Sequence, residues 1–398
     1  MPRWSSFDQF LNDALNEPLE ARQALVNALL KEHPNWPWVQ GPVATFIYAR
    51  PGADSVAVSL DSIKKDPPFV PMENIAGTML WHVTLSFQPD DLLDYMLIVN
   101  DPMTPLAGDP DLEARIHDHW MPDPYNPSRI TMGSMNVSVL RLEDARPFPD
   151  WTKLMSVSHG EVTEHTIDST QLNFSGRKLW IYTPDGYEDS GRDYPLLILL
   201  DGQWGNGPLQ VPAIADALIK YGRMEPVVIA MFQAGDQANR IKTLISNDRH
   251  YLFLLTELLP FVQTNYRIDV SNLGVGGFGE SAIAAAHAAL SNPEVFAHLI
   301  MVSPPLGKGS AEDKLREYAD RFEHAQMLPR RIFQSVGRYE INARYRLPAY
   351  LLRTILIRRQ DTAYKFVEIG SGHGLTGFRS VLPEALAWAY PAEAGAGS

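Results

Sequence analysis

The stretch LGVGGFGESAIAAAHAAL, residues 273–290, decides the fold. Its first half is apolar and rich in glycine, which is typical of a buried strand, and its second half is rich in alanine, which favours a helix. Between the halves stands Gly279-Glu280-Ser281-Ala282. A serine between a strand and a helix occupies a tight turn that exposes its hydroxyl above the sheet. This setting predicts Ser281 as a nucleophile, with the helix N-terminus favouring developing negative charge.

The residues around Ser281 depart from the G-x-S-x-G pattern at its last position, where Ile283 replaces glycine. A glycine there lets the turn approach a neighbouring strand closely. An alternative interpretation is that Ser281 caps an ordinary helix, because serine is a favoured N-cap residue. In the nucleophile hypothesis, the backbone N–H of Ala282 is one oxyanion donor.

Short apolar runs separated by helical stretches extend outward from this turn. They are PLLILLDG, PVVIAMF, HLIMVSP, RIFQSVG and YKFVEIG. Continuous apolar strands with helices between them indicate a parallel sheet covered on both faces. We therefore expect an α/β fold, which NVSVLRL, EVTEHTID and KLWIYTP enter as antiparallel strands.

A histidine and a carboxylate follow late strands of this sheet. His373 comes directly after YKFVEIG, and small neighbours allow its imidazole to reach the serine as general base. Glu340 follows RIFQSVG at the same sheet edge, whereas Asp361 precedes YKFVEIG and belongs to the opposite edge. This geometry favours Glu340 as the acid that orients His373. The alternatives are a loop histidine without a role and a surface glutamate in an ion pair.

The loop after PLLILLDG is expected to supply the second oxyanion donor, the backbone N–H of Gln203. Trp204, next to it, is either a wall of the pocket or a core aromatic residue. His117 and His119, in IHDHW, have no further ligand types nearby, so they predict no metal site. No cofactor is expected.

The N-terminal half has a different pattern. Residues 5 to about 32 carry apolar side chains at helical spacing and predict one amphipathic helix. TFIYARP, SVAVSL, MLWHVTLSF and DYMLIVND then follow as β-type runs, which is typical of a small β-sandwich. The segment from about 101 to 130 is rich in proline and aspartate and reads as an irregular linker. The expected domains are residues 1–150, with helix, sandwich and linker, and residues 151–398, the catalytic domain.

Composition excludes several classes of function. The net charge of -13 disfavours a nucleic-acid partner, because phosphate binding needs a basic face. The chain has no cysteine, which excludes disulfides, thiolate catalysis and cysteine-ligated zinc. No apolar run has the length of a membrane span, and the first residues lack a secretory h-region. A cytoplasmic protein without a membrane partner is expected, and the oligomeric state is not predicted.

Several of these motifs resemble the enterochelin (ferric enterobactin) esterase family, in the esterase D group of α/β hydrolases. The family's motifs are similar to residues 122–127, 199–204, 240–247, 257–260, 279–281, 337–340 and 371–373. The resemblance covers most of the chain. It implies an early-set (Ig-like) β-sandwich ahead of an α/β-hydrolase domain.

The resemblance also implies a function. It is that of a serine esterase that forms an acyl-enzyme with a small-molecule ester, either a catecholate siderophore or an aryl or feruloyl-type ester. Ferric siderophores are anionic, and Arg240, Lys242 and Arg338 are cations at matching loop positions, where arginine is suited to pair with oxyanions. Departures from the family pattern flank the pocket, among them Thr243 and Ile283. They support the alternative of a catalytically weak or inactive binding protein with the same fold.

Overall fold

The computed structural model describes residues 2–132, 135–235, 240–307 and 312–392. The chain forms two compact units. One comprises Met1–Arg146 and Gly370–Gly377, and the other comprises Pro147–Ile369 and Phe378–Ser398. The sequence placed residues 370–377 in the second domain, but the structure groups them with the first unit, where Leu92 N donates to Gly370 O at 2.8 Å.

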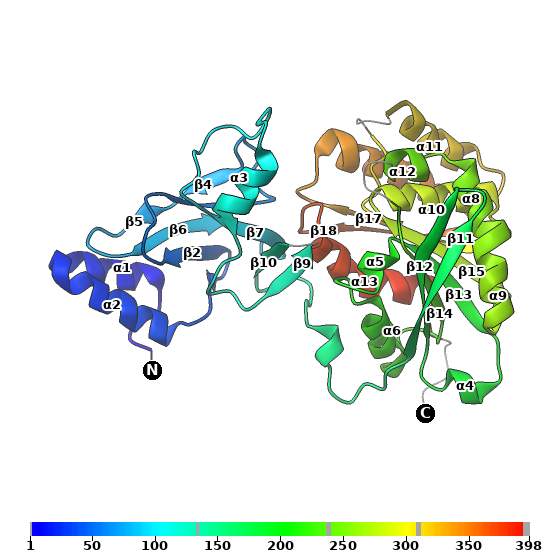
Figure 1. Ribbon diagram of the computed structural model, residues 1–398, viewed down its shortest axis with the longest axis horizontal. Coiled ribbons are helices and arrows are strands. Elements are labelled where there is room, and N and C mark those ends of the chain that lie inside the picture. The colour runs from blue at the N-terminus through cyan, green and yellow to red at the C-terminus, as the bar shows by residue number, and fades with distance from the viewer. Residues whose placement is uncertain (1, 133–134, 236–239, 308–311, 393–398) are drawn as a thin grey trace. The chain divides into compact units, whose positions relative to one another are not determined.

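The first unit begins with two helices, α1 (Phe7–Asn16) and α2 (Leu19–Glu32), as Figure 1 shows. The prediction of a single helix over residues 5 to 32 is therefore wrong. Glu17 is extended, with φ -84° and ψ 151°, because the residue before a proline is disfavoured in the helical region. Pro18 then precedes the first turn of α2.

Two antiparallel sheets complete this unit, in the orders β1-β2-β6-β5 and β4-β3-β7-β10-β9, with β8 paired to β7. The strands are β1 (Trp38–Gln40), β2 (Val43–Ala49), β3 (Val56–Leu60), β4 (Phe69–Pro71), β5 (Glu73–Asn74), β6 (Leu80–Ser86), β7 (Leu92–Val99), β8 (Trp120–Met121), β9 (Arg129–Met132) and β10 (Met135–Arg141). The four predicted β-type runs are β2, β3, β6 and β7. That the two sheets form an early-set sandwich stays a prediction.

Two predictions for this region are wrong. NVSVLRL, expected in the α/β sheet, is β10 and pairs with β7 of the first unit. The segment from 101 to 130 is not an irregular linker, because it contains the helix α3 (Leu112–His119) and two strands. Arg115 on α3 is buried and pairs with Asp101 at 2.6 Å, which orders this proline- and aspartate-rich segment.

The second unit is built on an eight-stranded sheet of order β11-β12-β14-β13-β15-β16-β17-β18. Its strands are β11 (Glu161–Ser169), β12 (Phe174–Thr183), β13 (Tyr194–Leu200), β14 (Val228–Phe232), β15 (Ile268–Phe278), β16 (Phe296–Val302), β17 (Arg331–Gly337) and β18 (Ala363–Ile369). β11, β12 and β14 pair antiparallel, and the six strands from β14 to β18 run parallel. This is the expected α/β-hydrolase arrangement, with the decisive turn after the fifth strand.

Helices cover both faces of this sheet (Figure 1). The helices of this unit are η1 (Trp151–Lys153), α4 (Tyr187–Ser190), α5 (Gly202–Gly205), α6 (Val211–Lys220), α7 (Arg240–Leu244), α8 (Asp248–Phe253), η3 (Leu254–Leu258), α9 (Leu259–Asn265), α10 (Glu280–Ser291), α11 (Glu312–His324), η4 (Asn342–Arg346), α12 (Leu347–Leu356) and α13 (Leu375–Ala389). Leu196 and Ile198 join Ile283 of α10 in one core, while Leu197 is equally buried on the other face. The central strands are apolar throughout because both faces are covered. Among the described residues, no helix is long and apolar enough to span a membrane.

Candidate active site

One residue of the turn between β15 and α10 has a backbone conformation that glycine adopts readily and other residues rarely do, and that residue is Gly279. Its φ of 55° and ψ of -124° lie outside the regions that side chains readily adopt. Gly279 N donates to Val302 O at 2.9 Å, which ties the turn to the end of β16. In an α/β hydrolase, the residue on this sharp strand-to-helix turn carries the exposed nucleophile. Here that position has no side chain.

Ser281 lies inside α10 rather than on the turn. It is 0% exposed, and its Oγ accepts from Phe278 N at 2.8 Å and donates to Phe278 O at 3.0 Å. The expectation that Ser281 stands on the turn with its hydroxyl above the sheet is therefore wrong. The reason is local, since α10 already begins at Glu280 and directs Ser281 back toward the strand.

The small residues around the turn identify its register. A Cβ added at Gly277 would lie 2.6 Å from Ser281 Oγ, so these two residues meet across the turn. The pattern G-x-S-x-G therefore falls on residues 277–281, with glycine in place of serine and serine in place of the last glycine. Ile283 is then no departure, because it is an ordinary buried residue of α10. The spacing of these small residues was the signal in the sequence.

The two predicted oxyanion donors have different surroundings. Ala282 N donates to Gly279 O at 3.0 Å, so this N–H is engaged within the turn. Gln203 lies in α5, directly after β13, and its side-chain Oε1 accepts from Ala234 N at 3.0 Å. Gly202 allows this loop to approach β14, because a Cβ there would lie 2.3 Å from the Met231 carbonyl carbon. The role of the Gln203 backbone stays a prediction.

The candidate acid and base each follow, in the chain, the late strand predicted for them. Glu340 follows β17, is 3% exposed, and its Oε2 accepts from Gly337 N at 2.9 Å. Asp361 precedes β18 at the other edge and pairs with Arg359 at 2.6 Å. His373 is exposed and follows β18 in the segment that groups with the first unit. The catalytic roles of Glu340 and His373 stay predictions.

Arg240 is not an open cation at the mouth of a pocket. Its side chain is 4% exposed and binds both carboxylate oxygens of Asp201. Burial alone would lower the pKa of Arg240, but pairing with Asp201 outweighs it, so the net shift is upward. The half-buried Trp204 lies beside it, with the Arg240 Cζ 4.9 Å from the ring centroid. Trp204 is thus a packing partner of Arg240.

Glu280, the first residue of α10, extends this pairing. Its Oε2 is 3.5 Å from Arg240 Nε, and its Oε1 is 2.9 Å from Arg344 Nη2. We call Asp201, Arg240, Glu280 and Arg344 the charge cluster. The sequence pattern does not predict it, because its members come from four separate segments. The predicted binding residue Arg338 also faces a carboxylate, with its Nε 3.7 Å from Glu368 Oε1.

Two further buried serines lie beside the turn and were also missed. Ser303 directly follows β16, has a φ of 51°, and donates its N–H to Ser335 O at 3.1 Å. The hydroxyl oxygens of Ser303 and Ser335 are buried without a hydrogen-bond partner among the described residues. Unpaired buried hydroxyls are costly and are often satisfied by water or a ligand.

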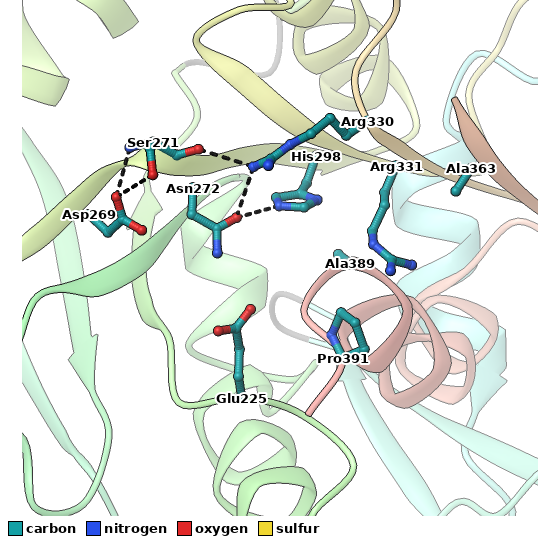
Figure 2. A pocket seen from close by; sticks show the side chains of 10 residues that line it. All are labelled: Glu225, Asp269, Ser271, Asn272, His298, Arg330, Arg331, Ala363, Ala389 and Pro391. Carbon is teal, nitrogen blue, oxygen red and sulfur yellow. Dashed lines mark hydrogen bonds between the residues drawn. The ribbon is translucent and has the colours of Figure 1, made fainter. Parts of the chain in front are cut away.

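A separate polar pocket of about 510 Å³ lies at the amino ends of the parallel strands, away from the turn (Figure 2). It contains both acidic and basic side chains, among them Glu225, Asp269, Arg330 and Arg331. The buried His298 donates from Nε2 to Asn272 Oδ1 at 2.6 Å there. Burial, and then the nearby arginines, lower the pKa of His298 to about 4. Ligand sites of open α/β sheets lie at the other edge, so we place the candidate site at the turn.

Comparison with known proteins shows that the chain is similar to esterases. The family model described as "Putative esterase" matches residues 175–389, just over half of the chain. The iron(III) enterobactin esterase of Escherichia coli K12 is 26% identical over 239 residues, which cover 56% of this chain and 58% of that protein. The sequence match thus spans little more than half of that relative.

Solved structures show the same fold. The ferric enterobactin esterase of Salmonella typhimurium has a TM-score of 0.73 and 20% identity, covering 91% of this chain and 98% of that one. A ferulic acid esterase has a TM-score of 0.50 and 17% identity, covering 58% of this chain and 99% of that one. The likeness to the first protein extends over both units, whereas the second covers little more than half of the chain.

Proposed function

We propose, from the premise that the chain belongs to the putative esterase family, that it recognises carboxylic esters without cleaving them through Ser281. One observation carries this proposal, namely that the residue with positive φ on the turn, where a nucleophile would stand, is Gly279. Acyl transfer by a serine hydrolase needs a hydroxyl at this position, next to a general base. Glycine offers none.

Ser281 is a poor substitute in this geometry. Its Oγ would have to leave both Phe278 N and Phe278 O before it could attack a carbonyl. Leaving the buried Phe278 N–H unsatisfied costs about 1–3 kcal/mol, and the first turn of α10 would also have to open. These costs support recognition over turnover.

The proposed ligand is a small-molecule ester with an aromatic acyl part. The similar proteins support this class, because they are named as esterases of iron(III) enterobactin and of ferulic acid. We propose a catecholate or feruloyl-type ester at the carboxyl edge of the sheet, near the charge cluster. Trp204 beside Arg240 provides an aromatic surface there.

A second candidate function is hydrolysis, which membership of the esterase family favours. In it, Ser281 attacks the ester, His373 takes its proton, Glu340 orients His373, and water hydrolyses the acyl-enzyme. This candidate requires that α10 open to release the Ser281 hydroxyl.

A fluorophosphonate probe together with ester titration separates the two. Recognition without turnover predicts no labelling, hydrolysis of p-nitrophenyl acetate no faster with the wild type than with Ser281→Ala, and saturable binding of methyl ferulate by calorimetry. Labelling at Ser281, located by peptide mapping and lost in Ser281→Ala, would establish hydrolysis instead. Failure of all tested aryl esters to bind would refute recognition.

A further inference from the structure

The polar pocket of Figure 2 is built on the amino ends of three neighbouring strands, β15, β16 and β17. His298 on β16 and Arg331 at the start of β17 are register partners, so they are direct neighbours across the two strands. The His298 ring packs against the buried Tyr390, with ring centroids 4.8 Å apart, which gives the pocket an ordered floor. Its volume of about 510 Å³ lies in the usual range for sites of small molecules.

The two arginines of this pocket are held by neutral groups and not by carboxylates. Arg330 Nη2 donates to Ser271 O at 3.0 Å, and Arg331 Nη1 donates to Trp388 O at 3.4 Å. Neither guanidinium forms an ion pair with a side chain that the structure describes. Two positive charges without a carboxylate partner therefore line the pocket, and guanidinium groups are suited to bind the carboxylate of a ligand.

Asn272 adds a neutral donor beside these charges. Its Oδ1 accepts from His298 Nε2 at 2.6 Å, and Arg330 Nη2 lies 3.5 Å from the same oxygen. Its amide Nδ2 has no hydrogen bond to the described residues, so it can donate to a ligand. His298 Nδ1 is buried and also lacks a partner in the described part of the chain. Buried polar atoms of this kind are usually satisfied by water or a ligand.

The opposite charge is present in the same pocket. Asp269 Oδ1 accepts from N and Oγ of Ser271 at 2.9 and 2.7 Å, and its carboxylate forms no ion pair with a described residue. Figure 2 shows Asp269 to the left of Asn272 and Arg331 to its right. Glu225 is a second carboxylate of the lining. Two carboxylates and two arginines match a ligand that carries one charge of each sign.

The neighbouring charges do not alter this balance. An adjoining pocket of about 590 Å³ shares three lining residues with the first and adds one cation and one anion, Arg192 and Asp193. Lys365 on β18 is already paired with Glu384 on α13, with Nζ and Oε1 2.6 Å apart. Apolar surface in the first pocket comes from Ala363, Ala389 and Pro391.

We infer that this pocket is a second ligand site, and that it binds an α-amino acid with an apolar side chain. The ligand carboxylate pairs with Arg330 and Arg331, and Asn272 Nδ2 donates to it as well. The ligand ammonium group pairs with Asp269. A ligand with a single negative charge would be repelled by the pocket carboxylates, and a ligand with a single positive charge would be repelled by the arginines. The site is separate from the turn after β15 and does not depend on ester recognition there.

The test uses three ligands of matched shape and different charge, titrated by calorimetry at neutral pH. L-leucine carries both charges, 4-methylpentanoate lacks the ammonium group, and 3-methylbutylamine lacks the carboxylate. We expect the wild type to bind L-leucine saturably and to bind each of the other two at least about tenfold more weakly, because each loses one ion pair and leaves the opposing charges of the pocket uncompensated. This comparison needs no variant and stands even if a substitution prevents folding.

Two variants locate the ligand in the pocket. Arg331→Gln should weaken L-leucine at least about tenfold and should not weaken 3-methylbutylamine, which has no carboxylate. Asp269→Asn should weaken L-leucine at least about tenfold and remove its advantage over 4-methylpentanoate. The matched control is Arg358→Gln, which removes the same charge from an exposed position after α12 and should leave all three affinities unchanged.

Three outcomes would overturn the inference. No saturable binding of L-leucine by the wild type up to about 10 mM would refute an amino-acid site. Equal affinities for L-leucine and 4-methylpentanoate would refute the role of Asp269. An Arg331→Gln variant that binds L-leucine as Arg358→Gln does would place the ligand outside this pocket. Ester recognition at the turn is tested separately with methyl ferulate, so either proposal can fail without the other.

Discussion

Gly277 and Ser281 meet across the turn after β15, where a Cβ on Gly277 would lie 2.6 Å from Ser281 Oγ. Such an approach requires small residues at both positions. It leaves the residue halfway between them, Gly279, at the apex of the turn with a φ of 55°. Sharp strand-to-helix turns of this kind carry the nucleophile in α/β hydrolases, and here the residue at the apex is a glycine, which has no side chain.

Gly279→Ser is expected to convert the chain into a serine esterase. The new hydroxyl would stand at the apex of the turn, where α/β hydrolases present their nucleophile. We expect fluorophosphonate labelling at residue 279 and hydrolysis of p-nitrophenyl acetate at least about a hundredfold above the wild type, which is the lower end of what nucleophilic and base catalysis contribute. A positive φ strains serine by about 1–3 kcal/mol, so this variant should also unfold at lower urea.

The control for this gain is Gly279→Ala, which carries the same backbone strain but no hydroxyl. It should lose stability as Gly279→Ser does and gain no activity. A wild type that is already as active as Gly279→Ser and is labelled at Ser281 would contradict the assignment of the G-x-S-x-G pattern to residues 277–281.

Ser281→Ala is expected to affect stability rather than turnover. Removing the hydroxyl leaves the buried Phe278 N–H without the partner that it has at 2.8 Å, which costs about 1–3 kcal/mol of unfolding free energy. Urea unfolding measures this loss, and the exposed Ser175→Ala on β12 is the control, with a change within about 0.5 kcal/mol. An unchanged stability together with abolished ester hydrolysis would restore Ser281 as nucleophile.

The sheet and its functional edge could be predicted from the sequence, because apolar runs and their order determine a parallel sheet and the edge at which each loop emerges. Glu340 and Asp361 were assigned to opposite edges on this basis, and they lie there. The strand NVSVLRL shows the limit. Its pattern predicts a strand but does not identify its partner, and it pairs with β7 of the first unit.

The residue at the apex of the turn could not be predicted from the sequence. Both Gly279 and Ser281 stand between a strand and a helix in the sequence, and only the backbone angles identify Gly279 as the apex. Likewise, Arg240 is a plausible surface cation in the sequence. Its partner Asp201 is distant along the chain and reaches it only through folding. A local sequence pattern does not predict which side chains pair when they are far apart along the chain.

Glu340→Gln and Asp361→Asn should differ strongly in the Gly279→Ser background. Glu340 follows β17 at the edge of the turn, and as the acid it would hold the tautomer of His373 and support its cation. Glu340→Gln should therefore lower kcat/KM at least about a hundredfold. Asp361 pairs with Arg359 at the other edge, so Asp361→Asn should lower kcat/KM less than about threefold. Steady-state kinetics on p-nitrophenyl acetate decides, and the reverse order would refute the strand-edge assignment.

The stability of the chain should fall in mild acid because of His298. Burial, then Arg330 and Arg331, lower its pKa to about 4 from the ordinary value of 6.5. Below pH 6.5 the unfolded chain takes up a proton that the folded chain takes up only near pH 4, so the free energy of unfolding decreases as pH falls through this window. The shift corresponds to about 3 kcal/mol at most. His298→Gln keeps a donor for Asn272 but cannot titrate, so its unfolding free energy by urea should depend less on pH between about 6.5 and 4. His117→Gln, at an exposed position, should follow the wild type. Parallel pH profiles for the wild type and His298→Gln would show that His298 does not titrate differently in the folded and unfolded chains.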